Sequence, residues 1–463
     1  MDFNNTRDTY KKFIYKDYKI YEDNSKIYIE YHFEIEGLSE FIHKIEILKK
    51  KFKFKDLFSN IVKNIVFNLG MIEAISYFKC TCSKNFIINC GNLNKEQEEW
   101  YKKIYYLGLG EFRYLNNIEI NIENFIHFVS NGENIEIQNI EEELEGFIIP
   151  VGGGKDSVVT LDLLKNYIDE SYVFCIGSKS VSMECANIAG YENDKIIEVK
   201  RIIDNNLIKL NEKGFFNGHT PFSASVAFLT YLVSYLLGKK YVVLSNEDSA
   251  NESNVVGEKI NHQYSKSLEF ENDFRFYAEK YLKANVEYFS LLRPITEFQI
   301  AMLFSKLEKF HKIFKSCNVG SKTEPWHWCL NCPKCLFVFI ILSPFLYKEK
   351  LIDIFGEDLF EREDLLNTFI ELCGYGETKP FECVGTYSEV RYAITSVIKN
   401  SNKKLPFLLQ YYKDSLLNND KELLSYYKDK SKIQDENLLK YYNENNNIPK
   451  EFESILKSKL QQL

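Results

Sequence analysis

A short segment rich in glycine carries residue types that suit the binding of an anion. It lies between an apolar run and a stretch with helical spacing, and it reads Gly152-Gly153-Gly154-Lys155-Asp156-Ser157; we call it the glycine loop. Glycines let an anion approach the backbone, and the N–H groups and dipole of a helix N-terminus favour negative charge. The segment predicts a phosphate site, with a simple turn between strand and helix as the alternative.

Two familiar phosphate motifs do not fit the glycine loop. A P-loop needs Ser or Thr after its lysine and an earlier glycine, but this chain has Asp156 and Ile149 there. The dinucleotide fingerprint needs a third glycine where Ser157 stands. The loop instead resembles the SGGxDS loop of the PP-loop ATP pyrophosphatases, with Gly152 in place of the leading serine.

That resemblance implies roles for the glycine loop. In the PP-loop superfamily the loop grips the pyrophosphate of ATP, an acceptor oxygen attacks the α-phosphate, and AMP is transferred. Lys155 would neutralise phosphate charge, and Ser157 would donate a hydrogen bond to a phosphate oxygen. Asp156 would cap the following helix or help to hold Mg²⁺.

Four cysteines in the second half of the chain have the spacing of metal ligands. Two CxxC steps share one cysteine and follow a more distant one, in the order Cys317, Cys329, Cys332 and Cys335. Four thiolates from such a knuckle close a tetrahedral zinc site with no open position, so we expect a structural Zn²⁺. The alternatives are reduced cysteines buried in a core, or His327 replacing one thiolate.

The elements around these motifs predict an α/β fold of the PP-loop type. Strands at "GFIIPV", "YVFCIG", "KIIEVK" and "YVVL" alternate with helical stretches, which indicates a parallel sheet with helices on both faces. Ligands bind at the carboxyl ends of such strands. There the glycine loop would meet Asn246, Glu247 and Asp248, which could hold Mg²⁺ or a ribose or be solvated loop charges.

The remaining segments frame this region. We expect an α+β N-terminal domain over residues 1–143, a PP-loop ATP-binding domain with the cysteine cluster over 144–345, and a helical region over 346–463. The long helix "PFSASVAFLTYLVSYLLG" should begin near Pro221 and end near Gly238.

Composition narrows the classes of function. The net charge is −8 and no long basic run occurs, so no nucleic-acid partner is expected. We found neither a signal peptide nor an apolar stretch of about 18 residues, and expect no membrane span. The eleven cysteines then suit a reducing cytoplasm. The sequence does not indicate an oligomeric state.

Several segments in a fixed order give a closer resemblance. They are "FNLGMIEAISYFKCTCS", "EEWYKKIYYLGLGEFRYLNNI", "PVGGGKDS", "GHTPFSASVAFLTYLVSYLLG", "CLNCPKC" and "KPFECVGTYSEVR". Together they resemble the ATP-dependent UDP-N-acetylmuramoyl-L-alanyl-L-glutamate epimerases (MurL type) over roughly residues 55–395. The resemblance implies ATP and Mg²⁺ as cofactors, inversion of the terminal L-glutamate of the UDP-linked dipeptide, and release of AMP and diphosphate.

Such a reaction needs residues that move a proton. A thiol with a tuned pKa can act as acid or base at an α-carbon, so Cys383 with its neighbour Glu382 is our first candidate, against a packed turn. His219 is the second, against a helix cap or an adenine contact. Glu111 and Arg113 are weaker candidates for contacts to the UDP-sugar.

Other functions remain open at this point. A PP-loop nucleobase-modifying enzyme resembling 7-cyano-7-deazaguanine synthase also pairs such a loop with a late cysteine cluster, but it lacks anything like residues 1–140. A tRNA-thiolating PP-loop enzyme fits poorly with the acidic charge balance. A nucleotide sensor without catalysis is favoured only by Gly152.

Overall fold

The fold is α/β, as predicted, and it is built on one large mixed sheet. The computed structural model describes residues 1–137, 142–177, 180–255, 257, 260–320, 324–429 and 436–462. Within them the ten strands of the sheet follow the order β10-β9-β6-β7-β8-β3-β2-β1-β4-β5. The strands are β1 (Lys12–Glu22), β2 (Lys26–Ile35), β3 (Ser39–Leu48), β4 (Asn85–Ile88), β5 (His127–Ser130), β6 (Phe147–Pro150), β7 (Ser171–Ile176), β8 (Ile196–Ile202), β9 (Tyr241–Leu244) and β10 (Glu287–Ser290).

The half of the sheet from β10 to β8 is parallel throughout. Its strands are short and buried on both faces, which is what a parallel sheet covered by helices requires. Ile148 packs in one core, while its neighbours Phe147 and Ile149 pack in the other, on the opposite face. The predicted strands in this region are confirmed.

The N-terminal strands join the same sheet through an antiparallel pair. β1, β2 and β3 form an antiparallel meander, and β3 pairs with β8 from Ile47↔Val199 to Lys44↔Ile202. The whole sheet is therefore mixed rather than parallel. The predicted boundary between residues 143 and 144 lies between β5 and β6 in the chain. Strands from both sides of this boundary belong to the same sheet.

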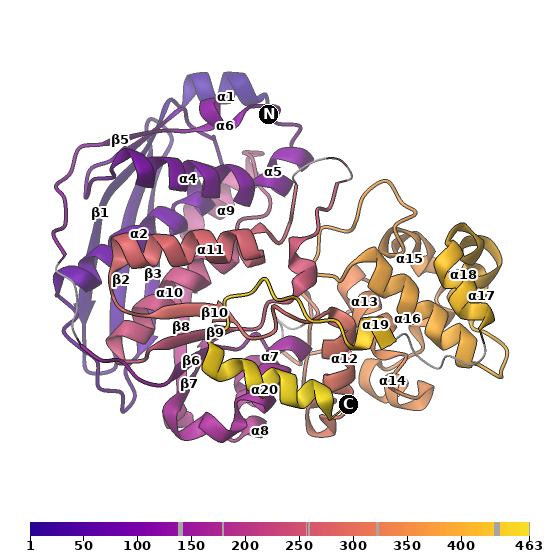
Figure 1. Cartoon of the computed structure of the whole chain (residues 1–463). Coiled ribbons are helices and arrows are strands. Elements are labelled where there is room, and N and C mark those ends of the chain that lie inside the picture. Colours follow the sequence, from indigo (N-terminus) through magenta and orange to yellow (C-terminus); the bar gives the residue numbers. More distant parts are fainter. Residues whose placement is uncertain are drawn as a thin grey trace.

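Helices cover both faces of the sheet and form a lobe beside it. α2, α10 and α11 lie over one face, α7, α8 and α20 over the other, and α13 to α18 gather in the lobe at the right of Figure 1. The helices before the glycine loop are α1 (Phe3–Thr9), α2 (Asn60–Glu73), α3 (Ile75–Phe78), α4 (Lys95–Gly108), α5 (Gly110–Leu115) and α6 (Ile122–Phe125). The next are α7 (Lys155–Leu163), α8 (Val181–Ala189), α9 (Asn205–Glu212), α10 (Phe222–Leu236), α11 (Leu268–Tyr277) and α12 (Glu297–Ser305). The last are α13 (Pro333–Leu342), α14 (Lys348–Phe355), α15 (Leu366–Leu372), α16 (Tyr387–Asn400), α17 (Phe407–Tyr411), α18 (Lys421–Lys428), α19 (Glu436–Leu439) and α20 (Lys450–Gln461).

A long apolar helical stretch lies in the protein core. Contrary to the expectation that no apolar stretch has this length, Asn60–Phe78 is long and apolar enough to cross a membrane, but 89% of its most apolar window is buried inside the protein. It packs as α2 and α3 against the meander, and Tyr31 Oη donates to Val66 O at 3.1 Å. Burial of this kind is typical of a core helix.

The chain end returns to the parallel strands. The helical region expected over residues 346–463 ends in α20, which lies beside α7 (Figure 1). Leu456 is fully buried, and the Phe452 ring stacks on that of Phe289 with 6.1 Å between centroids. The last helix is therefore part of the core.

Candidate functional site

A cavity of about 780 Å³ lies where the glycine loop follows strand β6. Its lining combines that loop with segments far apart in the chain, among them His219, Asn246, Lys266, Lys334 and Cys383. Of the loop after β7, Ser180 lines the cavity and residues 178 and 179 lie outside the described residues. The volume suits a nucleotide-sized ligand.

The glycine loop connects β6 to α7 with an unstrained helix start at Gly154. Gly153 has φ +80°, and a Cβ added there would lie 2.8 Å from Val181 Cγ1. Gly152 lines the cavity, and a Cβ there would meet nothing within 4 Å. A serine, as in the SGGxDS pattern, would therefore fit at residue 152, whereas residue 153 requires glycine.

Lys155 is not among the residues that line the cavity, and its side chain reaches a group of carboxylates. Its side chain is 2% exposed, and Nζ donates to both Asp156 and Glu297. One oxygen each of Asp156, Glu247 and Glu297 lie within 4.8 Å of one another. We call these three residues the carboxylate cluster. The group thus has three carboxylates and one ammonium, which contacts two of them, so it attracts a further cation.

Burial sets the electrostatics of the carboxylate cluster. It raises the pKa of Glu297 well above its ordinary value, and the charges of Asp156 and Glu247 add to this effect while Lys155 opposes it. The pKa of Glu247 is also raised, first by burial and then by Asp156. A nearby positive charge would favour the ionised form of these carboxyl groups, and ionised carboxylates are ligands that suit Mg²⁺. Glu297, the first residue of α12, was not a candidate from the sequence because no motif marks it.

Of the other residues predicted around the phosphate site, Ser157 and Asn246 line the cavity, whereas Asp248 contacts the C-terminal segment. Ser157 lines the cavity, and its Oγ donates to Gly154 O at 3.0 Å. Asn246 lines the cavity, and its backbone carbonyl accepts from Ser290 Oγ at 2.6 Å. Asp248 instead accepts from Tyr441 Oη and Asn443 Nδ2, both at 2.8 Å, and so holds the C-terminal segment.

A second charged group at the cavity surrounds Cys383. Lys266 Nζ donates to Cys383 Sγ at 3.0 Å, and the His262 ring hydrogen-bonds the same thiol. Burial by itself would raise the pKa of Cys383, but Lys266, Lys334 and His262 outweigh it and bring the pKa well below the ordinary value. A cysteine with such neighbours is a thiolate at neutral pH.

Histidines and a glutamate extend this group. His262 Nδ1 contacts Glu111 Oε2, and the His219 ring centroid lies 4.2 Å from that of His262. Burial lowers the pKa of His262, but the bonds to Cys383 and Glu111 dominate and raise it to about 9. Burial and the His262 charge lower the pKa of His219 to about 3. We call Glu111, His219, His262, Lys266 and Cys383 the thiolate cluster.

Asn254 sets the geometry of the thiolate cluster through the backbone. Its Nδ2 donates to Pro380 O at 2.9 Å, and its Oδ1 accepts from the His262 backbone N–H at 2.8 Å. The backbone N–H of Lys379 donates to Asn254 O at 2.9 Å. One side chain, 3% exposed, thus ties the loop that carries Cys383 to the loop that carries His262.

Two sequence candidates lie outside the thiolate cluster. Glu382 accepts from Asn318 Nδ2, and among the described residues the cavity lining includes Cys383 without Glu382. Arg113 stacks on the Tyr106 ring at 3.6 Å and donates to Tyr106 O. His262 and Lys266 were missed because they lie in an irregular polar segment, and Lys266 is 117 positions from Cys383.

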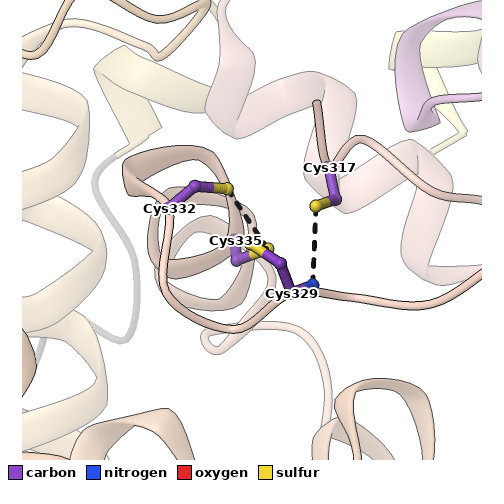
Figure 2. A group of neighbouring side chains, drawn as sticks. All are labelled: Cys317, Cys329, Cys332 and Cys335. Carbon is purple, nitrogen blue, oxygen red and sulfur yellow. Dashed lines mark hydrogen bonds between the residues drawn. The ribbon is translucent and has the colours of Figure 1, made fainter. Parts of the chain in front are cut away.

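The four cysteines of the zinc prediction come together at the start of α13 (Figure 2). One sulfur from each of Cys317, Cys329, Cys332 and Cys335 lies within 4.8 Å of the others. His327 does not belong to this group; its Nδ1 bonds Pro325 O at 2.9 Å. The cysteines border the cavity, since Cys317 is part of its lining.

Comparisons with known proteins agree with one another. Residues 4–291 match the model of the MurL N-terminal domain, and residues 313–425 match that of the MurL C-terminal domain. A protein of Xanthomonas oryzae pv. oryzae is 32% identical over 343 residues, which cover 73% of this chain and 75% of the relative. One of Salinispora tropica is 33% identical over 331 residues, covering 71% of each chain. Both relatives are named UDP-N-acetyl-alpha-D-muramoyl-L-alanyl-L-glutamate epimerase.

Proposed function

The chain belongs to the MurL family, and from this premise we propose that it inverts the terminal glutamate of UDP-N-acetylmuramoyl-L-alanyl-L-glutamate by way of an acyl-adenylate. It is an isomerase of peptidoglycan precursor synthesis. One observation supports the mechanism most: a single cavity is lined both by the glycine loop and by a cysteine held as thiolate. The first suits activation by ATP, and the second suits proton transfer.

The substrate explains why ATP is needed. Its glutamate nitrogen is already an amide, so it cannot form an imine with pyridoxal phosphate. Its α-carboxylate is an anion, and removal of the α-proton would place a second negative charge beside it. In our proposal a carboxylate oxygen attacks the α-phosphorus of ATP and diphosphate leaves. The adenylate has lost the anionic charge, so its α-proton is more acidic, and water later releases AMP.

The phosphates of ATP would lie against the glycine loop, as in a PP-loop fold. The backbone N–H groups at the start of α7 and the Ser157 hydroxyl supply donors there. Lys315 and Lys334 line the same cavity and supply positive charge. The carboxylate cluster fits Mg²⁺ by donor type and by its excess negative charge. Bound there, Mg²⁺ would neutralise phosphate charge.

The thiolate cluster would move the proton. Cys383 as thiolate is the base that takes the α-proton, and Lys266 holds it in the charged form. His262 is charged at neutral pH, is backed by Glu111, and is the acid that supplies a proton. His219 is neutral, so one ring nitrogen can accept a proton while the other donates.

The deciding experiment follows both half-reactions in D₂O. The protein is mixed with ATP and Mg²⁺, with and without the UDP-linked dipeptide, and diphosphate release and the chirality and deuterium content of the glutamate are measured. We expect diphosphate that depends on the dipeptide, and deuterium in D-glutamate. Silence with the dipeptide but turnover of a carboxylated deazaguanine would contradict the proposal and favour the nucleobase-modifying alternative.

A variant separates the two half-reactions. Cys383→Ser should still form diphosphate but lose deuterium incorporation by about 100- to 10,000-fold, the usual contribution of a positioned acid or base. The matched control is Cys90→Ser, which removes a half-buried thiol that is not part of the cavity lining and should behave as the wild type. Normal D-glutamate from Cys383→Ser would remove Cys383 from the mechanism.

A further inference from the structure

We propose that Cys317, Cys329, Cys332 and Cys335 bind one Zn²⁺, and that this zinc joins two segments of the cavity wall. Cys332 Sγ lies 3.4 Å from Cys335 Sγ, and Cys329 Sγ lies 3.8 Å from it. A tetrahedral site with Zn–S bonds of about 2.3 Å requires sulfur–sulfur distances of about 3.8 Å. These two separations are close to those of a Zn²⁺ coordination shell, and all four sulfurs lie within 4.8 Å of one another.

The backbone around the sulfurs supports a metal centre rather than a disulfide. Gly320 N–H donates to Cys317 Sγ at 3.1 Å, and Cys329 N–H approaches the same sulfur at 3.5 Å (Figure 2). Such bonds stabilise thiolates, the form that binds zinc. Leu330, between Cys329 and Cys332, has φ +63°, which turns the chain so that both thiols face the same point. The sulfur separations exceed by far the disulfide length of about 2.05 Å.

The cysteines come from two segments that both reach the cavity. Cys317 follows Lys315 and Ser316, while Lys334 lies between Cys332 and Cys335; all three of these neighbours line the cavity. The Lys315 backbone N–H donates to Gly153 O at 3.0 Å, within the glycine loop. Asn318 donates to Glu382, the neighbour of Cys383. Zinc would thus fix the 315–320 segment and the start of α13 against each other, beside both reactive ends of the cavity.

Zinc is preferred over other metals and over buried thiols for chemical reasons. Four soft sulfur ligands in tetrahedral arrangement select Zn²⁺ among abundant divalent ions, and they leave no position for a substrate. Cys329 and Cys332 are only half-buried, unlike the fully buried Cys80 and Cys175. The site is therefore a structural metal centre with two ligands near solvent.

Metal content of the full chain tests the proposal without ATP or substrate. We expect about one zinc per chain by elemental analysis of protein purified from zinc-supplemented medium. The double variant Cys329→Ser/Cys332→Ser should lose most of it, whereas Cys90→Ser should keep it. Wild-type protein with no zinc and four alkylatable thiols, or with a Cys332–Cys335 disulfide in the mass spectrum, would overturn the proposal.

Co²⁺ bound in place of zinc tests the same site in the wild-type chain, so this test does not depend on variants that fail to fold. Co²⁺ bound to the wild-type chain should show the visible absorption and the sulfur-to-metal charge-transfer bands of a tetrahedral thiolate site. The spectrum should disappear on addition of one equivalent of Zn²⁺, which has no d-electron preference against tetrahedral coordination and binds such thiolate sites more tightly than Co²⁺. An octahedral spectrum, or none, would contradict four thiolate ligands.

ATP binding is a second measurement; it rests on the proposed function and is independent of the metal content. Removal of zinc by a chelator should weaken ATP binding, because the Lys315–Gly153 contact loses its support. Zinc present but ATP affinity unchanged after its removal would overturn the link to the cavity wall. Zinc present with no ATP binding at all would contradict the proposed function and leave the metal site standing.

Discussion

At the scale of single residues, the site depends on charges that hold one another in unusual states. Cys383 keeps a thiolate because Lys266 and His262 face it, and His262 keeps its proton because Cys383 and Glu111 face it. Lys155 is balanced in the same way by Asp156 and Glu297. Removal of one member therefore changes the protonation of its neighbours as well as its own contact.

The thiolate cluster gives a pH dependence with a definite sign. The pKa of His262 is raised from about 6.5 to about 9, so its contribution to stability is full below pH 6.5 and is lost as the pH rises through about 9. If His262 is the acid, dipeptide-dependent deuterium exchange should fall over the same range. A rate profile in D₂O buffers measures this. A flat profile between about pH 7 and 10 would exclude His262 as the acid.

At the scale of elements, the turn between β6 and α7 determines how close a ligand can come. Gly153 adopts a left-handed φ and packs against Val181 and Ser182, at the start of α8. Gly152 faces the cavity without contacts to an added Cβ. Gly153 is therefore required for its backbone conformation and close packing, whereas Gly152 leaves open space beside the cavity.

A matched pair of alanine variants tests this difference. Gly153→Ala should lower the free energy of unfolding by about 1–3 kcal/mol, because it places a side chain in a left-handed conformation and against α8. It should also weaken ATP binding. Gly152→Ala should change stability by less than about 0.5 kcal/mol. Urea unfolding of both variants gives the comparison, and equal losses would show that the loop relaxes around either side chain.

At the scale of the molecule, the last helix connects the C-terminal region to the parallel strands. The Phe452 ring contacts those of Phe147 and Tyr241, with centroids 5.3 and 5.0 Å apart, and Tyr241 Oη donates to Glu451 at 2.7 Å. α20 lies beyond both family-model matches, the second of which ends at residue 425. The chain end nevertheless packs directly beneath the strand that leads into the glycine loop.

Truncation of this aromatic contact should destabilise the whole fold. Phe452→Ala should cost about 3–5 kcal/mol, the usual range for a buried phenylalanine. Tyr347→Ala is the control, because that side chain is 86% exposed and its removal should be nearly neutral. Denaturant midpoints measure both. A neutral Phe452→Ala would mean that α20 contributes no stability to the parallel strands.

The sequence by itself determined the local elements and the motifs attached to them. Short apolar runs located β6 to β9 and helical spacing located α10, and the glycine loop falls between strand and helix as predicted, because such patterns depend on residues a few positions apart. The cysteine spacing likewise indicated that the four sulfurs could meet. Patterns among residues this close in the chain can be recognised without knowledge of the fold.

Only the tertiary structure decided which distant side chains face one another. The pairing of β3 with β8 makes one mixed sheet, and the packing of α12 against α7 brings Glu297 to Lys155. The tertiary structure also brings Lys266 to Cys383 across 117 positions, while it leaves Glu382 and Asp248 to other partners. These contacts follow from strand order and loop packing, which depend on the whole chain at once and have no local pattern.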